Sequence, residues 1–288
     1  MVSYSIQKVP ASTPASDLAA ILRKDGALVV QRLVEPAILD TIHQELALKT
    51  IGPLVGLAAK SKTFASELLT NSVAQEVASL ILTRSTSSYW GPKKSVSTSI
   101  HRLSATTLFL HGPGYEGDDL MREDEAHHVR HPASPVEADL GIVFAGTALR
   151  AGAGARKVIL LSNHWDDEKV PRSELAEDVE LDAGDALFFT DIGFLSMGST
   201  YTAPGPNTST DKYLFSIEVD FCGGWCRSRE NQYLAVPREI IESYPEKTQR
   251  LLGWYIRSPY GGYVEMMDPL EWLKTGGDLA KFRPGDLV

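Results

Sequence analysis

Cysteine, basic residues and long apolar runs are all scarce in this sequence, and each scarcity excludes a class of protein. Only two of the 288 residues are cysteines, Cys222 and Cys226, which is too few for a disulfide framework. The 28 lysines and arginines are outnumbered by 37 aspartates and glutamates, and the formal net charge is −9. Nucleic acid is therefore not an expected partner, because phosphate contacts need clustered basic residues. No run of about 18 apolar residues occurs, so we expect no membrane span or membrane partner.

The N-terminal residues also lack a basic stretch followed by an apolar one, so we expect no secretory signal. Together with the two cysteines, this indicates a reducing, cytoplasmic location. A hydrophobic content of 43% and a charged content of 23% are typical of a globular protein with a sizeable core. Because the sequence shows no internal repeat and no low-complexity linker, we interpret 1–288 as a single domain.

Helix and strand signals alternate in the first part of the chain. Residues 16–17 are typical of a helix cap, and Gly26 of the end of that helix. The apolar run 27–30 predicts a short buried strand. Pro36 suits the first position of a second helix, and the apolar spacing in 63–83 predicts one or two more helices.

Short runs rich in Val, Ile, Phe and Thr dominate the middle of the chain, which is typical of a sandwich or barrel. The predicted strands lie at 105–111, 139–146, 156–161, 179–181, 186–190 and 212–222. In the last of them, alternation predicts one face with Tyr213, Phe215, Ile217, Val219 and Phe221 and another with Leu214, Ser216, Glu218 and Asp220. After Pro237 the pattern returns to helix.

Several phrases follow one another along most of the chain beyond residue 20. They are KDGALVV (24–30), PGYEGDDLMRED (113–124), DLGIVFAGT (139–147), VILLSNHWDD (158–167), LDAGDALFFTD (181–191), NTSTDKYLFS (207–216), RENQYL (229–234) and GYVEMMDP (262–269). In this order and spacing they resemble the phytanoyl-CoA dioxygenase-like family of Fe(II)/2-oxoglutarate oxygenases, in particular its fungal secondary-metabolite branch.

The resemblance implies a mainly β chain with helical decoration. Its core is a double-stranded β-helix, that is, a jelly-roll or cupin-like barrel, with helices at both chain ends. The expected division is a helical N-terminal part at about 1–90, a β-helix core at 95–222 and a C-terminal cover at 223–288.

In that family, iron is held by a His-x-Asp pair on one strand and by a second His further along the chain. Residues two apart on a strand face the same cavity, so both side chains reach one metal. Three ligands leave positions for 2-oxoglutarate and oxygen. An Arg on a neighbouring strand clamps the distal carboxylate of the cosubstrate.

This sequence departs from the family pattern at each of these positions. The His-x-Asp pair falls on Met121 and Glu123, the second His on Thr202, and the clamping Arg on Leu214. A Gln that often helps to hold the cosubstrate falls on Asp118. A thioether suits Cu(I) better than Fe(II), and a hydroxyl is a poor ligand for a divalent transition metal. The resemblance therefore implies vestigial positions, with no cofactor bound by this chain and with Fe(II) and 2-oxoglutarate in an active partner.

Other candidate groups favour structural roles. We interpret the cluster of His127, His128 and His131 as part of a surface loop, and Cys222 and Cys226 as buried thiols at a strand end. Trp165 is interpreted as a core anchor. The remaining isolated histidines are expected to be structural or surface residues; they are His43, His101, His111 and His164.

Three functional hypotheses follow. The first is a non-catalytic pseudoenzyme in fungal secondary-metabolite biosynthesis, for example of a meroterpenoid. It would pair with a paralogous dioxygenase as a hetero- or homodimer, and the aromatic stretch 252–263 is a candidate for the interface. The second is a metal-independent isomerase or cyclase with Glu123, Asp118 or Tyr201 as acid or base. The third is an active oxygenase that recruits His127 or His128. The resemblance suggests a bulky, apolar small-molecule substrate.

Overall fold

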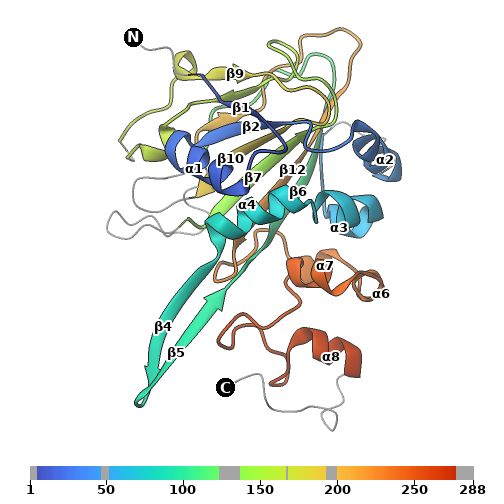
Figure 1. Cartoon of the computed structure of the whole chain (residues 1–288). Helices are drawn as coiled ribbons and strands as arrows, with labels where there is room; N and C mark the ends of the chain where they lie inside the picture. The colour runs from blue at the N-terminus through green and yellow to red at the C-terminus, as the bar shows by residue number, and fades with distance from the viewer. Residues whose placement is uncertain (1–4, 47–51, 123–136, 167, 193–199, 277–288) are drawn as a thin grey trace.

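A seven-stranded sheet forms the centre of the protein (Figure 1), in a computed structural model that describes residues 5–46, 52–122, 137–166, 168–192 and 200–276. Its strands, in spatial order, are β1 (Lys8–Pro10), β2 (Ala27–Gln31), β10 (Ala186–Ile192), β7 (Asp139–Ala145), β12 (Leu214–Gly223), β6 (His101–His111) and β3 (Gly52–Val55). The β1–β2 pair is parallel, and the other neighbouring pairs are antiparallel.

A smaller sheet lies over one face of the large one. It has the order β11 (Thr202–Ala203), β8 (Arg156–Val158) and β9 (Glu177–Val179). Val158 and Val179 of the small sheet share an apolar cluster with Val143 and Leu187 of the large sheet. The two sheets therefore enclose a common interior, which is the arrangement of a barrel or sandwich.

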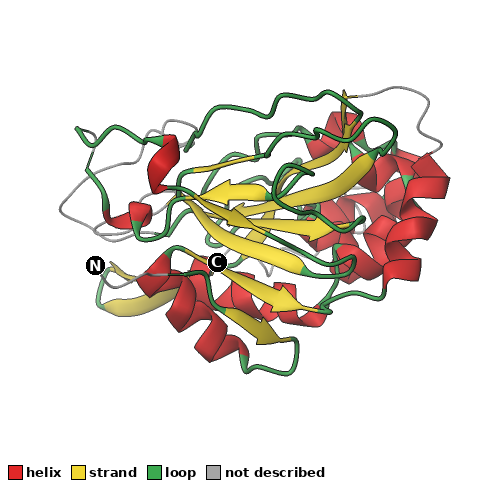
Figure 2. Ribbon diagram, turned by 90° about the horizontal axis from the view of Figure 1, so that it is seen from above, coloured by secondary structure: helices red, strands yellow, loops and turns green. Residues whose placement is uncertain are grey.

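Helices pack against the other face of the large sheet (Figure 2). The N-terminal ones are α1 (Ala15–Asp25), α2 (Pro36–Leu46), α3 (Leu57–Lys60), a π-helical turn (Phe64–Leu68) and α4 (Ser72–Leu82). The C-terminal ones are α5 (Gln232–Ala235), α6 (Arg238–Ser243), α7 (Glu246–Leu251) and α8 (Pro269–Thr275). Short 3-10 turns occur at Ser162–His164 and Ser173–Leu175. No helix in the described ranges is both long and apolar enough to span a bilayer.

The alternation predicted for 212–222 is confirmed from Leu214 on, whereas Tyr213, predicted on the apolar face, precedes β12 and is exposed. Phe215, Ile217 and Phe221 lie in the cluster between the sheet and the helices, whereas Leu214 lies in the cluster between the two sheets. Because successive side chains of a strand point to opposite faces, Glu218 shares the interior face with Leu214.

Several local predictions are also confirmed. The first helix ends at Gly26, whose φ of 85° is the left-handed conformation that favours glycine. A strand follows at 27–31, and Pro36 begins α2. The capping prediction is wrong, because the N-cap is Pro14 and residues 16–17 lie inside the first turn.

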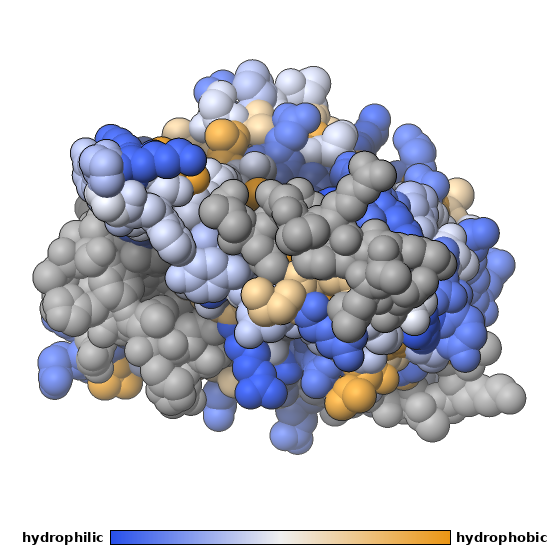
Figure 3. Space-filling model, turned by 90° about the horizontal axis from the view of Figure 1, so that it is seen from below, coloured by the Kyte–Doolittle hydropathy of each residue, from blue (hydrophilic) through white to orange (hydrophobic). Residues whose placement is uncertain are grey.

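Two further differences have local causes. The strand predicted at 156–161 ends at Val158, because Leu161 has a φ of 61° and precedes a 3-10 turn. A hairpin of β4 (Arg84–Trp90) and β5 (Lys93–Ser99) occupies a stretch rich in Ser and Thr, for which no strand was predicted. On the face seen from below, hydrophobic residues form small separate spots among hydrophilic ones (Figure 3). The interpretation of 1–288 as a single domain stays a prediction.

Candidate functional site

Met121 and Thr202, the two described positions that the resemblance assigns to iron ligands, face each other across an isolated antiparallel bridge. The Met121 amide donates to the Thr202 carbonyl over 3.2 Å, and the Thr202 amide donates to the Met121 carbonyl over 3.1 Å. Directly opposite residues of an antiparallel pair project to the same side. The Met121 residue is 56% exposed, whereas Thr202 is buried. The fold therefore brings together two positions that are distant in the sequence.

The Thr202 hydroxyl is occupied by a buried cation. Arg156 donates from Nε to Thr202 Oγ1 over 2.9 Å and from Nη1 to Glu218 Oε2 over 2.7 Å. The side chains of Arg156 and Glu218 are 10% and 15% exposed. Because Arg156 belongs to β8 and Glu218 to β12, this ion pair crosses the interior from the small sheet to the large one.

An aromatic ring supports the guanidinium group of Arg156. The Arg156 Cζ atom lies 5.5 Å from the centre of the Phe189 ring, within range of a cation–π contact. Phe189 in turn lies over Gly141 of the neighbouring strand, where a Cβ atom would come within 2.2 Å of the ring. Gly141 thus provides the space that lets Phe189 take this position.

A second polar group lies where β6 ends. His111, the last residue of β6, pairs with Leu214 on β12, and its ring stacks on Tyr115 with the centroids 3.9 Å apart. Burial lowers the pKa of His111, while the Asp118 carboxylate opposes this shift and Arg156 reinforces it. Burial and the carboxylate of Asp118 raise the pKa of Tyr115. Burial therefore favours the neutral imidazole of His111, the form that can accept a proton.

The remaining predicted site residues fall into three environments. Leu214 is buried and packs near Gly154 and Leu149. Asp118 is exposed, and its amide donates to the Pro204 carbonyl over 3.1 Å. Glu123, together with His127, His128 and His131, lies outside the described residues.

Tyr201 lies beside Arg122 and Trp165. Its ring lies 4.7 Å from the Arg122 Cζ atom and 5.9 Å from the Trp165 ring. Tyr201 directly precedes β11, and its amide donates to Ser162 Oγ over 2.9 Å. Trp165, which was expected to anchor the core, is half-buried and has the Lys169 ammonium 3.7 Å above its ring.

The other single candidates take structural positions. His101 is buried against Gln75, with 2.8 Å between Nε2 and Oε1, and the His43 ring stacks on Phe215. His164 Nε2 lies 2.8 Å from the Lys24 carbonyl. Cys222 and Cys226 are free thiols, the first of them buried, and burial raises the pKa of both.

His111 is thus a candidate acid–base group that the sequence analysis did not single out. Sequence reasoning had grouped it with the structural histidines, although its place at the end of a predicted strand, directly before the PGYEGDD phrase, was the available signal. Arg156 was missed too, because no spacing rule connects it with Thr202 or Glu218.

The described donors at the predicted iron positions are a thioether and a hydroxyl that already accepts a hydrogen bond from a guanidinium group. Within the described ranges, no group of three or more His, Cys, Asp or Glu side chains is arranged to hold a metal ion. Neither donor has the imidazole or carboxylate chemistry that Fe(II) prefers.

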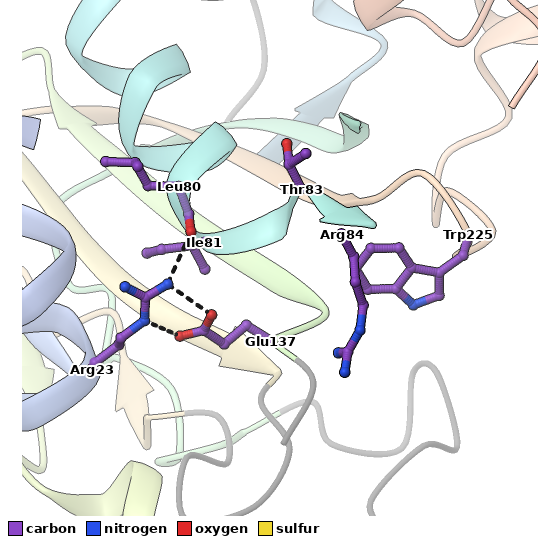
Figure 4. A pocket seen from close by; sticks show the side chains of 7 residues that line it. All are labelled: Arg23, Leu80, Ile81, Thr83, Arg84, Glu137 and Trp225. Carbon is purple, nitrogen blue, oxygen red and sulfur yellow. Dashed lines mark hydrogen bonds and ion pairs between the residues drawn. The ribbon is translucent and has the colours of Figure 1, made fainter. Parts of the chain in front are cut away.

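A separate polar cavity of about 200 Å³ contains none of the predicted site residues (Figure 4). It is lined by Arg23, Leu80, Ile81, Thr83, Arg84, Glu137 and Trp225. Arg23 and Glu137 point toward each other and form a two-pronged ion pair, with Nε–Oε1 at 2.7 Å and Nη2–Oε2 at 3.1 Å. Since these two charges satisfy each other, we assign this cavity no role in the chemistry of the barrel.

Solved structures define the class of the fold. The non-heme alpha-ketoglutarate-dependent epimerase SnoN from nogalamycin biosynthesis is similar with a TM-score of 0.53 and 15% identity, over 81% of this chain and 90% of that one. The carbocyclase SnoK from the same biosynthesis is similar with a TM-score of 0.52 and 13% identity, over 74% of this chain and 85% of that one. These likenesses confirm the predicted double-stranded β-helix.

Sequence relatives are fungal proteins named dioxygenases. This chain is 28% identical to dioxygenase swnH1 of Metarhizium robertsii over 93% of its length and 92% of that protein. It is 26% identical to dioxygenase swnH1 of Arthroderma benhamiae (96% and 95%) and 27% identical to dioxygenase peniF of Penicillium patulum (94% and 92%). No protein-family model matches the chain. The predicted likeness to fungal dioxygenases is thus confirmed.

Proposed function

We propose that this chain is a relative of the Fe(II)/2-oxoglutarate dioxygenases that lacks their metal site. It acts as a non-catalytic subunit of an active paralogous dioxygenase in fungal secondary-metabolite biosynthesis, for example of a meroterpenoid. The observation that carries the proposal is the hydrogen bond from Arg156 Nε to Thr202 Oγ1. By the resemblance, Thr202 stands where an iron-binding imidazole would be. The chain instead keeps a guanidinium cation against that position.

Electrostatics supports this reading. Two like unit charges about 4 Å apart repel by about 4 kcal/mol at an effective dielectric constant of 20, and a divalent ion doubles the repulsion. Glu218 offsets the charge of Arg156, but the carboxylate oxygen that does so is already engaged at 2.7 Å. Glu218 is therefore held as the partner of Arg156.

The position that the resemblance assigns to 2-oxoglutarate binding also supports the loss of the site. Leu214 offers an isobutyl group, packed in the apolar cluster with Leu149, where a 2-oxoglutarate carboxylate would need a cation. The described part of the site thus fits neither Fe(II) nor 2-oxoglutarate, and no catalytic step through either is derived for this chain.

Anaerobic titration of the purified chain with Fe(II), followed by a 2-oxoglutarate consumption assay, tests the loss of the site. We expect no saturable iron binding and no succinate formation, with an intact paralogous dioxygenase as the positive control. Stoichiometric iron binding with turnover would contradict the proposal and favour an oxygenase that uses ligands such as His127 or His128.

Co-expression with the paralogous dioxygenase tests the subunit role. We expect the two chains to co-purify and the paralogue to be more active or more stable in the complex than alone. Independent elution of the two chains, with unchanged activity of the paralogue, would remove the support for this role.

A second candidate, a metal-independent isomerase or cyclase acting on a bulky apolar intermediate, is favoured by one observation. His111 is half-buried at the end of β6, its ring stacks on Tyr115, and burial lowers its pKa against the opposing effect of the Asp118 carboxylate. Such a group is suited to take up a proton from a bound substrate.

Conversion of a pathway intermediate by the chain in the presence of EDTA would support this candidate. We then expect His111→Phe, which keeps the stacking but lacks the ring nitrogens, to abolish turnover, and Asp118→Asn to reduce it. Tyr201→Phe is the matched control and is expected to leave the rate unchanged, because its ring contacts Arg122 and Trp165. Glu123→Gln tests the carboxylate that lies outside the described residues.

A further inference from the structure

The polar cavity of Figure 4 is built by segments that are far apart in the sequence. Arg23 belongs to the last turn of α1, residues 80–84 to the end of α4 and the start of β4, Glu137 precedes β7, and Trp225 follows β12. In Figure 4, Arg23 and Glu137 lie on one side of the cavity, and Arg84 and Trp225 lie on the other. The volume is about 200 Å³. Since a cavity of about 150 Å³ can hold a benzene ring, there is room here for one aromatic ring with a small substituent.

The wall formed by Arg23 is held in place by hydrogen bonds. Besides its two-pronged pair with Glu137, Arg23 donates from Nη2 to the Leu80 carbonyl near the end of α4, over 2.9 Å. Three segments are thereby joined at one side chain. A wall that is already ordered lowers the entropy that a small ligand loses on binding.

Trp225 forms the aromatic wall of the cavity. Its turn is closed by a hydrogen bond of 2.8 Å from the Cys226 amide to the Gly223 carbonyl. The Gly223 amide donates to the Ala138 carbonyl, also over 2.8 Å, and so joins this turn to the segment that carries Glu137. A Cβ atom on Gly223 would come within 2.5 Å of the Trp225 ring, so the indole packs closely over this glycine. Trp225 is half-buried and offers a flat apolar surface on which another ring can stack.

The charge of the cavity favours an anion. Its charged side chains are Arg23, Arg84 and Glu137, and the ion pair of Arg23 with Glu137 cancels one charge of each sign. Arg84 adds a further positive charge, although the chain as a whole has a net charge of −9. A guanidinium group has five N–H donors in a planar fork that matches a carboxylate, so contacts with the protein leave donors for a ligand.

We propose that this cavity binds a small aromatic carboxylate, with the ring stacked on Trp225 and the carboxylate paired with Arg84. Leu80 and Ile81 supply further apolar contact for the ring. The combination of one flat apolar wall and one guanidinium group selects against ligands that lack either the ring or the negative charge.

The cavity lies apart from the candidate site in the barrel. The ten residues of β12 lead from Leu214, which pairs with His111, to Gly223, and at about 3.3 Å per residue they span about 30 Å. Trp225 lies two residues beyond the Gly223 end. The inference therefore goes beyond the proposed function, and it is independent of whether the barrel binds iron or whether the chain has a paralogous partner.

Titration of the full chain with benzoate tests the proposal, with benzamide and acetate as matched comparisons. The indole N–H signals of the five tryptophans are followed by NMR, and Trp225→Phe assigns the signal of Trp225. We expect benzoate to shift this signal saturably, with a dissociation constant of about 1 mM or lower. Benzamide keeps the ring but lacks the charge, so it should bind at least about tenfold more weakly. Acetate lacks the ring and should give no saturable shift.

Variants locate the site by calorimetric titration with benzoate. We expect Arg84→Gln to raise the dissociation constant about tenfold, through loss of a charge-assisted hydrogen bond. Trp225→Leu should raise it about three- to tenfold, through loss of ring stacking. The matched control is a second Arg–Trp pair, in which Arg238 Cζ lies 5.0 Å from the centre of the Trp272 ring. Arg238→Gln and Trp272→Leu should leave the dissociation constant unchanged, and circular dichroism establishes that each variant is folded.

The comparison of benzoate with benzamide uses the natural chain and decides the question even if a variant does not fold. Absence of a saturable shift at Trp225 up to about 10 mM benzoate, a concentration well above the expected dissociation constant, would overturn the proposal. So would equal affinity for benzamide, or a loss of benzoate binding in the control variants that matches the loss in the cavity variants.

Discussion

Met121 and Thr202 pair through two backbone hydrogen bonds, of 3.2 and 3.1 Å, yet only Thr202 is buried. The pairing brings two positions far apart in the chain to one place, as the resemblance implies for two iron ligands. What differs is the chemistry of the side chains, and the Thr202 hydroxyl is engaged by Arg156. The backbone pairing is thus present although neither side chain is a histidine or a carboxylate.

Removing one partner of the buried ion pair should destabilise the fold. Arg156→Met leaves the Glu218 carboxylate largely buried without its cation, and we expect the free energy of unfolding to fall by about 3 kcal/mol. In Arg156→Met/Glu218→Leu no charge is stranded, so much of this loss should be recovered. Urea unfolding of the natural chain, both single variants and the double variant measures the coupling. Strictly additive losses would show that the two side chains do not act as a pair.

Gly141 should be intolerant of a methyl group. In Gly141→Ala the new Cβ would overlap the Phe189 ring, and overpacking of this kind lowers the free energy of unfolding by about 1–3 kcal/mol. Adding Phe189→Leu should restore part of the stability, because the smaller side chain makes space for the methyl group. Thermal unfolding of both variants checks this. If Phe189→Leu lowered stability equally with and without Gly141→Ala, the proposed contact would be contradicted.

His101 should make stability depend on pH. Burial, reinforced by the charge of Lys247, lowers the pKa of His101 from 6.5 to about 4. As the pH falls below 6.5 the unfolded chain takes up a proton, whereas the folded chain does so only near pH 4. The contribution of His101 to stability is therefore lost across this window, by about 2 kcal/mol between pH 7 and pH 5.

The variant His101→Gln isolates this effect from the titration of carboxylates. It lacks the titrating ring, so its free energy of unfolding should change less between pH 7 and pH 5 than that of the natural chain. Urea unfolding at both pH values gives the comparison. An identical pH dependence in the two proteins would show that His101 is not responsible.

The two thiols should be unreactive in the folded chain. Burial raises the pKa of Cys226 to about 12 and that of Cys222 further, with the Asp139 carboxylate adding to both shifts. Since the thiolate is the reactive form, reaction with a disulfide reagent at pH 8 should be slow in buffer and fast in urea. Cys226→Ser and Cys222→Ser assign any residual rate. Rapid reaction of either thiol in the native protein would argue for an accessible redox pair.

Local signals in the sequence were enough for much of the barrel. Alternation along 212–222 predicted the two faces of β12, and Gly26 marked the end of α1, because side-chain periodicity and a left-handed φ act within a few residues. The hairpin β4–β5 was not predicted, since its strands have neither the alternation nor the apolar content of a buried sheet. Its Ser- and Thr-rich sequence is that of a ribbon exposed on both faces.

The sequence by itself predicted, through the resemblance, which residues stand at the family's metal positions, and it determined which strand faces are apolar, because alternation acts between neighbours along the backbone. The meeting of Arg156 with Glu218 and Thr202, and of His111 with Tyr115 at the mouth, arose only when the two sheets packed together. The contacts of Arg156 join β8 with β11 and β12, and no pattern within one segment of the sequence predicts them. They depend on the register of distant strands and on the space that Gly141 leaves for Phe189 beneath the guanidinium group.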